Sequence, residues 1–427
     1  MARDLIHLLR TRRFLPLFVT QALGALNDNV FKNALVVLTI YRLAEQAGVD
    51  GQVIVTVAAG LFILPFFLFS ATAGQLADKY DKAGLIRWIK AAEVAIMALG
   101  AFGFWLGDVW FLIAVLFLMG SQSAFFGPIK YAILPDHLRR EELIGGNALV
   151  EAGTFVAILI GTIAGGLLIL RGQGILIVST IVIVLAVIGL LVSFAIPATG
   201  AAAPRLVINR NIAAETRAIV RYAAERREVY LAIIGISWFW LVGATFLSQF
   251  PAFSRDVLGG DETVVTLFLA LFSIGIGAGS LLNNVLLKGQ VSARYVPLAA
   301  AVITLSVLDL YVATADRRGD VQALMDVGAF VARPFGLRIV FDLTMTSVAG
   351  GVFAVPLYAI MQTRSEESHR SRVIAANNIL NALFMVAGAL VVVAMLAAGT
   401  GVPAVFLVLA LVNALIALGL WRRLKTR

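Results

Sequence analysis

The 427-residue chain contains no cysteine, which excludes disulfides, thiolate metal sites and a cysteine nucleophile. Histidine is almost as scarce, and His7, His137 and His369 all lie in polar stretches. The chain also lacks the glycine-rich loop ending in Lys-Ser/Thr that binds nucleotide phosphates. We therefore expect no metal, no other cofactor and no ATP-driven step, and we do not expect an enzyme.

Charged residues are also few. They make up 14% of the chain, against about 25% in soluble proteins, whereas hydrophobic residues make up 60%. A soluble fold of this size could not remove so much apolar surface from water, but a bilayer provides an apolar solvent for it. The composition predicts an all-α membrane protein without a soluble domain.

The apolar residues form runs of the length that a membrane-spanning helix needs, about 20 residues. We predict twelve transmembrane helices from these runs. Their approximate ranges are 14–41, 53–77, 84–106, 110–134, 143–170, 174–196, 230–254, 263–287, 295–313, 339–362, 374–398 and 402–421.

The net charge of +9 comes from basic residues in the short connections between these runs. If both termini are cytoplasmic, 25 of the 34 lysines and arginines fall on the cytoplasmic side and 7 on the opposite side. This asymmetry follows the positive-inside rule. It predicts a multi-pass protein of the inner-membrane type with both termini in the cytoplasm. It also explains the positive charge without a nucleic-acid partner.

The longest predicted cytoplasmic connection divides the chain in two. It begins with a linker-like run of Pro, Ala, Thr and Gly and continues as a basic amphipathic helix from Ile212 to Arg227. We predict an N-terminal six-helix bundle at 1–196, this connection at 197–228 and a C-terminal six-helix bundle at 229–427.

The two predicted bundles share short sequence matches at similar offsets. Phe126 and Tyr131 recur 227 positions later as Phe353 and Tyr358. Other matches recur at offsets of 210 and 230. Consistent offsets in corresponding helices indicate duplication. Two six-helix bundles in the same orientation form the parallel repeat of major facilitator transporters.

The first predicted helix carries an unusual number of polar side chains, namely Gln21, Asn27, Asp28, Asn29 and Lys32. Asp28 and Lys32 are four residues apart on one helix face, within reach of an ion pair. This pair could fix the helix to a neighbour, or the polar face could line a central cavity and contact a charged ligand or a coupling cation. We favour the cavity and assign all five residues to a substrate site.

The fourth and fifth predicted helices add Gln122, Lys130, Tyr131, Asn147 and Glu151 to this candidate substrate site. Lys130 could instead extend to the cytoplasmic interface, and the amides could simply join helices. Glu151 lies deeper and is harder to explain without a function. We assign no role to three further acids that lack a partner nearby in sequence: Glu93, Asp309 and Asp342.

The loop after the second predicted helix resembles the major facilitator signature of Gly, three residues, an acid and two basic residues. Gly74, Asp78, Lys79 and Lys82 match it and are our candidate gating residues. The acid can face a helix N-terminus while its basic neighbours bridge to another helix. Asp81 stands where the signature has glycine, so the conformation of this turn is an open question.

The first helix and several other segments resemble the bacterial lysophospholipid transporter family of the major facilitator superfamily. These segments span nearly the whole chain. They are Gln21–Asn33, Phe126–Pro135, Glu142–Thr154, Gln249–Pro251, Asp256–Glu262 and Val265–Gly275.

The resemblance implies a flippase that moves lysophospholipids, such as lysophosphatidylethanolamine, from the outer to the inner leaflet by alternating access. It implies re-acylation of the product by an acyltransferase, which we expect to be a separate polypeptide. The substrate and membrane lipids are then the expected partners. A proton- or sodium-coupled exporter of small amphipathic solutes would suit the same fold. A scaffold that only recruits the acyltransferase is less favoured, because it needs no buried charges.

Overall fold

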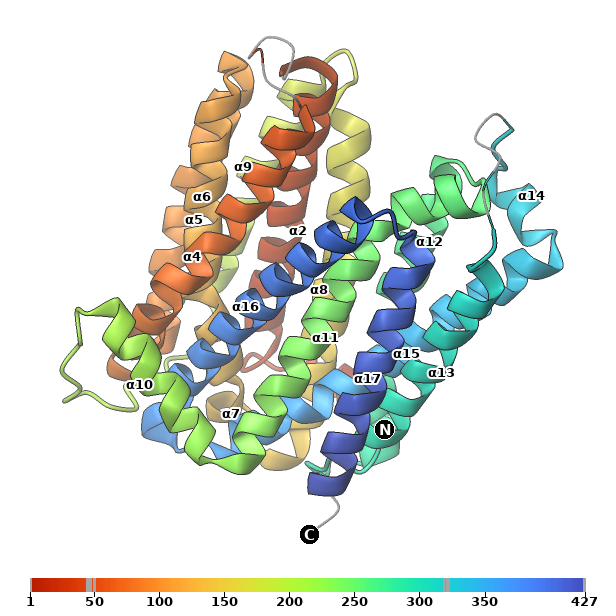
Figure 1. Cartoon of the computed structure of the whole chain (residues 1–427). Coiled ribbons are helices and arrows are strands. Elements are labelled where there is room, and N and C mark those ends of the chain that lie inside the picture. The colour runs from red at the N-terminus through yellow and green to blue at the C-terminus, as the bar shows by residue number, and fades with distance from the viewer. Residues whose placement is uncertain (1, 44–47, 49–50, 318, 320–322, 425–427) are drawn as a thin grey trace.

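The protein is almost entirely helical in its computed structural model, which describes residues 2–43, 48, 51–317, 319 and 323–424 (Figure 1). This part contains no strand longer than an isolated bridge between Gly260 and Met325. Twelve of its helices are 19 to 31 residues long. They are α2 (Leu15–Leu38), α4 (Gly51–Lys79), α5 (Lys82–Leu106), α6 (Val109–Ala132), α8 (Leu143–Ile169), α9 (Gly174–Ser193), α11 (Arg227–Ala252), α12 (Glu262–Leu287), α13 (Val296–Thr314), α15 (Pro334–Arg364), α16 (Arg370–Ala397) and α17 (Val402–Leu424).

Each of the twelve predicted spans corresponds to one of these helices. Eleven of the helices in the described part of the chain are long and apolar enough to cross a membrane. The remaining long helix is α2, whose apolar character is reduced by the polar residues Gln21, Asn27, Asp28, Asn29 and Lys32. The chain is therefore a multi-pass membrane protein, and α2 is the long helix whose polar groups reduce its apolar character most.

The long helices form two sets. In the N-terminal set, α2 packs on α8 and α9, α4 on α6, and α5 on α9. In the C-terminal set, α12 and α13 pack on α15, α13 on α17, and α11 on α16. The sets meet mainly where α8 contacts α12 and α4 contacts α16, and α16 crosses in front of the N-terminal set (Figure 1).

Glycine allows one of the closest helix contacts in the N-terminal set. A side chain on Gly161 of α8 would place its Cβ only 2.7 Å from the carbonyl oxygen of Leu26 and 2.8 Å from Cβ of Asn29. Small residues of this kind let helix backbones approach closely inside a membrane. The contact fixes the orientation of α2 and hence of its polar side chains.

The connection between the two sets lies against one end of the molecule, beside the short helix α7 (Leu134–His137). It leads to α10 (Ile212–Glu225), whose buried face of Glu215, Ile219 and Ala223 rests on α16 and α4. The C-terminal end of α17 lies at this same end of the molecule (Figure 1). We call it the α10 end. The other end carries η1 (Thr39–Leu43), η3 (Phe253–Leu258) and α14 (Val327–Val331).

Candidate functional site

The charged groups of α2 do not pair with each other. The described ion pairs, with a limit of 4.0 Å between nitrogen and oxygen, do not include Asp28 and Lys32. Asp28 instead accepts a hydrogen bond of 2.7 Å from the Ser123 hydroxyl of α6. The Lys32 ammonium lies 5.6 Å from the centroid of the Phe62 ring of α4. Both side chains are only partly buried, so the structure leaves two opposite charges available at membrane depth.

A fully buried ion pair also contacts α2. The Lys90 ammonium of α5 is 2.5 Å from the Glu93 carboxylate. The same carboxylate accepts hydrogen bonds from Gln122 of α6 at 2.9 Å and from Asn27 of α2 at 3.1 Å. Glu93 therefore joins α2, α5 and α6. The Lys90–Glu93 pair is the structural ion pair of the N-terminal set, and the alternative pair considered for Asp28 and Lys32 is not formed.

No role was assigned to Glu93 from the sequence. The 25 basic residues placed on the cytoplasmic side include Lys90, but it lies two turns inside α5 and is fully buried. The ammonium occupies space that only a glycine of α2 leaves free, because a Cβ on Gly24 would lie 2.7 Å from it. The spacing of a lysine and a glutamate three residues apart was the signal that could have revealed this pair.

Lys130, Tyr131 and Glu151 come together between the two sets. The Tyr131 hydroxyl donates a short hydrogen bond to Oε1 of Glu151. Oε2 of Glu151 is buried without a hydrogen-bond partner. The Lys130 ammonium lies over the Tyr131 ring, 4.8 Å from its centroid, and is not within ion-pair distance of the carboxylate. Lys130 is only partly buried. Like Asp28 and Lys32, it is a charge without an ion-pair partner nearby.

The repeated tyrosines stack on each other. The rings of Tyr131 in α6 and Tyr358 in α15 are 4.4 Å apart and inclined by 11°. The Tyr358 hydroxyl accepts a hydrogen bond of 2.8 Å from the Trp240 indole. Residues that recur at an offset of 227 positions thus meet where the two sets join.

The amides of the candidate site mainly connect helices. Asn147 of α8 and Gln362 of α15 exchange two hydrogen bonds of 2.7 and 3.0 Å across the two sets. Gln21 accepts a hydrogen bond of 3.0 Å from Thr154 of α8. Asn29 donates to the carbonyl of Ala25 in its own helix. These contacts favour the helix-joining interpretation for Gln21 and Asn147.

Aromatic rings line α4 and α6 beside Lys32. Phe69 lies 5.9 Å from Phe125 and 6.3 Å from Phe117, and Phe62 lies 6.2 Å from Phe66, measured between ring centroids. All five rings are partly exposed. This surface is apolar and directly adjoins the charged groups of α2.

The gating candidates lie at the α10 end. Asp78 is completely buried and accepts a hydrogen bond of 2.9 Å from the backbone N–H of Ser371, in the first turn of α16. Its other oxygen is 2.9 Å from the Arg372 guanidinium. Asp78 thus faces the N-terminus of α16, as the signature loop predicts, and also binds a basic side chain of the other set, which was not predicted.

A second ion-pair group adjoins Asp78. Asp136 of α7 contacts Lys82 at 2.9 Å and Arg370 of α16 at 3.0 Å. Gly74 lets α4 and α16 touch, because its Cβ would lie 2.9 Å from Cα of Arg372. Lys79 differs from these residues: its ammonium lies over the neighbouring Tyr80 ring. Gly74, Asp78 and Lys82 therefore belong to one contact region between the two sets. We call this region, which also includes Asp136, Arg370 and Arg372, the clasp.

The structure answers the question about Asp81. The residue has φ −59°, so the turn needs no glycine, and its carboxylate caps α5 by accepting the N–H of Gly84 at 2.7 Å. It also accepts the N–H groups of Thr199 and Gly200 at 2.8 and 3.0 Å. Partial burial opposes ionisation, but these hydrogen bonds outweigh it and lower the pKa of Asp81 below its usual value.

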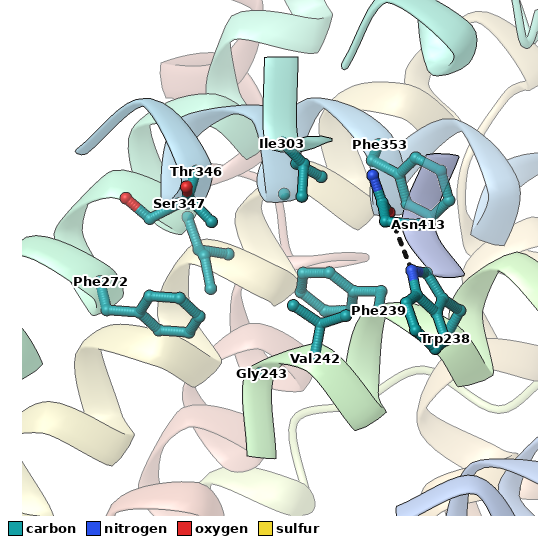
Figure 2. A pocket seen from close by; sticks show the side chains of 12 residues that line it. Trp238, Phe239, Val242, Gly243, Phe272, Ile303, Thr346, Ser347, Phe353 and Asn413 are labelled. Atoms are coloured by element: carbon teal, nitrogen blue, oxygen red, sulfur yellow. Dashed lines mark hydrogen bonds between the residues drawn. The ribbon is translucent and has the colours of Figure 1, made fainter. Parts of the chain in front are cut away.

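The C-terminal set contains a small apolar recess between α11, α12, α13, α15 and α17 (Figure 2). Its walls include Trp238, Phe239, Phe272, Ile303, Phe353 and Thr346. The charged residues of this set lie elsewhere: Arg338 of α15 forms two hydrogen bonds of 2.5 and 2.8 Å with Asp309 of α13. Among the described residues, no group of three or more His, Asp or Glu could hold a metal ion.

Comparisons with known proteins give a consistent result. The sequence profile described as Major Facilitator Superfamily matches residues 17–316. The lysophospholipid transporters LplT of Salmonella typhi and Salmonella newport are each 27% identical over 374 residues, which cover 84% of this chain and 81% of theirs.

The solved structures that resemble this chain show the same fold at low sequence identity. The human organic anion transporter MFSD10 (TETRAN) has a TM-score of 0.75 at 14% identity, covering 95% of this chain and 99% of its own. The transporter FucP in the outward conformation has a TM-score of 0.70 at 14% identity, covering 98% and 100%. A bacterial homologue of the iron transporter ferroportin in the outward-facing state gives 0.70 at 14%, covering 96% and 100%.

Proposed function

The chain belongs to the major facilitator superfamily, and we propose that it is a flippase that moves lysophospholipids from the outer to the inner leaflet of the bacterial inner membrane. The similarity to the LplT transporters supports this substrate class. A separate acyltransferase would then re-acylate the product, and this chain would perform transport without chemistry on the lipid.

One observation carries the proposal. Asp28, Lys32 and Lys130 are partly exposed at membrane depth, and none of them has an ion-pair partner within 4.0 Å among the described residues. An isolated charge in this position costs several kcal/mol unless it faces water or a ligand. A phosphoethanolamine headgroup offers a phosphate for the lysines and an ammonium for the aspartate. Gln21, Asn27, Asn29, Gln122, Tyr131, Asn147 and Glu151 would hold these helices in place around it.

The clasp supports alternating access. Its ion pairs join α4 and α7 of the N-terminal set to α16 of the C-terminal set, so they must break if the α10 end opens. We propose that residues 1–196 and 229–427 move as two bodies, and that Gly74, Asp78 and Lys82 control this end. The excess of lysine and arginine supports placing the α10 end, and both termini, in the cytoplasm. The described conformation is then closed to the cytoplasm.

The test is transbilayer movement of labelled lysophosphatidylethanolamine in vesicles containing the purified protein. Loss of a hydrogen bond to a charged group costs about 1.5–3 kcal/mol, so we expect D28N and K32M each to slow movement roughly tenfold to a hundredfold. D256N and R171M are the matched controls, because both change an exposed charge in a connection between helices. Movement no faster than in empty vesicles, or unchanged in D28N, would reject the proposal.

A coupled exporter of small amphipathic solutes is the second candidate, and Glu151 favours it. This carboxylate is 1% exposed, has one oxygen without a partner and lies where the two sets meet. Such a group could bind a proton or sodium ion during transport. Collapsing the proton or sodium gradient across the vesicles separates the candidates, because only the exporter would lose directional transport.

A further inference from the structure

Asp342 of α15 is a buried acid that the proposed transport site does not use. It lies eight residues after the start of α15 at Pro334, which places it about 12 Å along the helix from the end of the molecule opposite the α10 end. The residue is 2% exposed, and its Oδ2 atom has no hydrogen-bond partner. A carboxylate in such a position is unfavourable in its ionised form unless a cation or several hydrogen-bond donors compensate its charge.

The cation next to Asp342 is already bound to another acid. Arg338 lies one helical turn before Asp342, so the two side chains share a face of α15. The Arg338 guanidinium forms hydrogen bonds of 2.5 and 2.8 Å with the two carboxylate oxygens of Asp309 on α13. The described ion pairs include this pair but none between Arg338 and Asp342. Asp309 therefore has a bidentate cationic partner, whereas Asp342 has no ion-pair partner.

The two acids face each other where α13 packs on α15. Because Asp309 binds an arginine one turn from Asp342, the two carboxyl groups come within hydrogen-bonding range of each other. Among the described residues, Asp309 and Arg338 are the charged groups that act on Asp342. One positive charge thus faces two carboxyl groups. Carboxylates in contact inside a protein do not both ionise readily, and such pairs hold one proton between them.

A second unpartnered oxygen lies one turn deeper in α15. Thr346 is on the same helix face as Asp342, and its hydroxyl is also buried without a partner. Figure 2 shows Thr346 at the small recess of the C-terminal set. A hydroxyl can bond to a neutral carboxyl group, and it brings no positive charge that would favour the ionised form. The surroundings of Asp342 on both sides therefore suit a carboxyl group that carries a proton.

We propose that Asp309 and Asp342 share one proton and form a proton-binding site of the C-terminal set. The proton exchanges with water at the end opposite the α10 end, because Asp309 lies five residues before the end of α13 and the side chains of Asp309 and Arg338 are 43% and 46% exposed. When the proton leaves, Arg338 faces two carboxylates, and the contact between α13 and α15 changes. The site is separate from Glu151, and the inference holds whichever solute the protein carries.

Infrared spectroscopy detects the proton directly, because a protonated carboxyl group absorbs at a higher frequency than a carboxylate. In the detergent-solubilised protein at pH 7, we expect the wild type to show the absorption of one protonated carboxyl group that D342N lacks. D256N is the matched control, since it removes an exposed acid near the same end, and it should retain this absorption. No difference between the wild type and D342N would mean that Asp342 is ionised, and the proposal would be wrong.

The pH dependence of stability distinguishes a shared proton from a structural contact. Above about pH 4 the unfolded chain releases the proton that the folded pair keeps, so folding takes up a proton. The folding equilibrium constant of the wild type should therefore fall relative to that of D342N, by up to about tenfold for each pH unit, until the folded pair also loses its proton. D256N should follow the wild type. A ratio that stays constant with pH would overturn the proposal, because D342N would then have lost only a packing contact.

A second variant and a second ion complete the test. D309N frees Arg338 to pair with Asp342, so the absorption of the protonated carboxyl group should be missing from D309N as well, even if D342N does not fold. Its persistence in D309N would assign the proton to another group and overturn the pair. A sodium ion is the alternative occupant. Stabilisation by sodium chloride beyond that by choline chloride, in a wild type without the absorption, would assign the site to sodium and reject the shared proton.

Discussion

Charges at the α10 end and charges in the middle of the protein are paired in different ways. At the α10 end, Asp78 and Asp136 form ion pairs with Arg372 and Arg370 across the two helix sets. In the middle, Lys90 and Glu93 pair within one helix. Uncharged contacts also cross between the sets, such as the paired amides of Asn147 and Gln362.

The physical reason lies in the solvent that each pair would meet on separation. An ion pair broken inside the membrane leaves two charges in a medium of low dielectric constant, which costs several kcal/mol for each. An ion pair broken at the end of the molecule is hydrated as water enters. The protein therefore places separable ion pairs at the α10 end and permanent ones inside a helix set.

The permanent pair gives the largest expected effect. Replacing Lys90 by methionine leaves the buried Glu93 carboxylate without its cation, so we expect a loss of about 3–5 kcal/mol in stability. Thermal unfolding in detergent measures it, and the double variant K90M/E93L should recover most of the loss. The control K79M changes a lysine outside the buried network and should have little effect. Equal stability of K90M and wild type would remove the distinction between the two regions.

The clasp should respond by opening rather than by unfolding. D78N removes a charge that binds both Arg372 and the N-terminus of α16. We therefore expect the equilibrium between the closed and the open α10 end to shift by about 2–5 kcal/mol toward the open state. Because the chain has no cysteine, N378C introduces a single thiol on α16, at a buried position next to Gly127. Its reaction with a thiol reagent should accelerate in D78N. In D81N, whose carboxylate does not contact α16, it should stay slow.

A steric change in the clasp should give a smaller shift in the same direction. The Cβ of an alanine at position 74 would lie 2.8 Å from Cβ of Ala375, so α4 and α16 must separate slightly. Overpacking of this kind costs about 1–3 kcal/mol. In the N378C background, the thiol should therefore react faster in G74A than in the control G60A, which changes an exposed glycine of α4. Labelling as slow as in the G60A control would show that the helices adjust without opening.

The smallest effect concerns Asp81, which acts within the N-terminal set and its connection. Loss of a helix cap costs about 1 kcal/mol, and D81A also releases the backbone of Thr199 and Gly200. We expect trypsin to cleave D81A faster at Arg205 and Arg210, with little change in N378C labelling. Cleavage at the wild-type rate would mean that Gln75, which binds Asn209 at 2.7 Å, suffices to hold the connection.

The depressed pKa of Asp81 gives this contact a defined pH dependence. The folded-state pKa is lowered, so its stabilisation is fully present above the unfolded-state value of about 3.9 and is lost as the pH falls through the lower folded-state value. Trypsin is inactive in acid, so pepsin is the appropriate protease. Cleavage of the connection should accelerate only below pH of about 4 in the wild type, and D81A should lack this step.

The fold could be predicted from the sequence because hydropathy determines which segments lie in the membrane. The span predicted at 84–106 is α5 at Lys82–Leu106, and the one predicted at 339–362 is α15 at Pro334–Arg364. The observed helices extend beyond the predicted spans where charged residues continue a helix past the apolar run. Hydropathy also explains the error at Lys90, because a charge near the end of an apolar run looks like part of a loop.

The candidate site was less predictable, because the pairing of side chains depends on how each helix is rotated. The polar residues of α2 were identified, but the sequence does not show that Asp28 faces Ser123 while Asn27 faces Glu93. The partner of Asp309 is Arg338, 29 positions away on another helix. The recess has no sequence signal of its own, since its aromatic residues resemble the other phenylalanines of an apolar chain.

The stacked pair of Tyr131 and Tyr358 has a mechanical consequence. The rings meet near the α10 end, because Tyr131 is one residue from the end of α6 and Tyr358 is six residues from the end of α15. The two helix sets must therefore part or slide these rings whenever the α10 end opens, so the stack adds its own resistance to that of the ion pairs in the clasp.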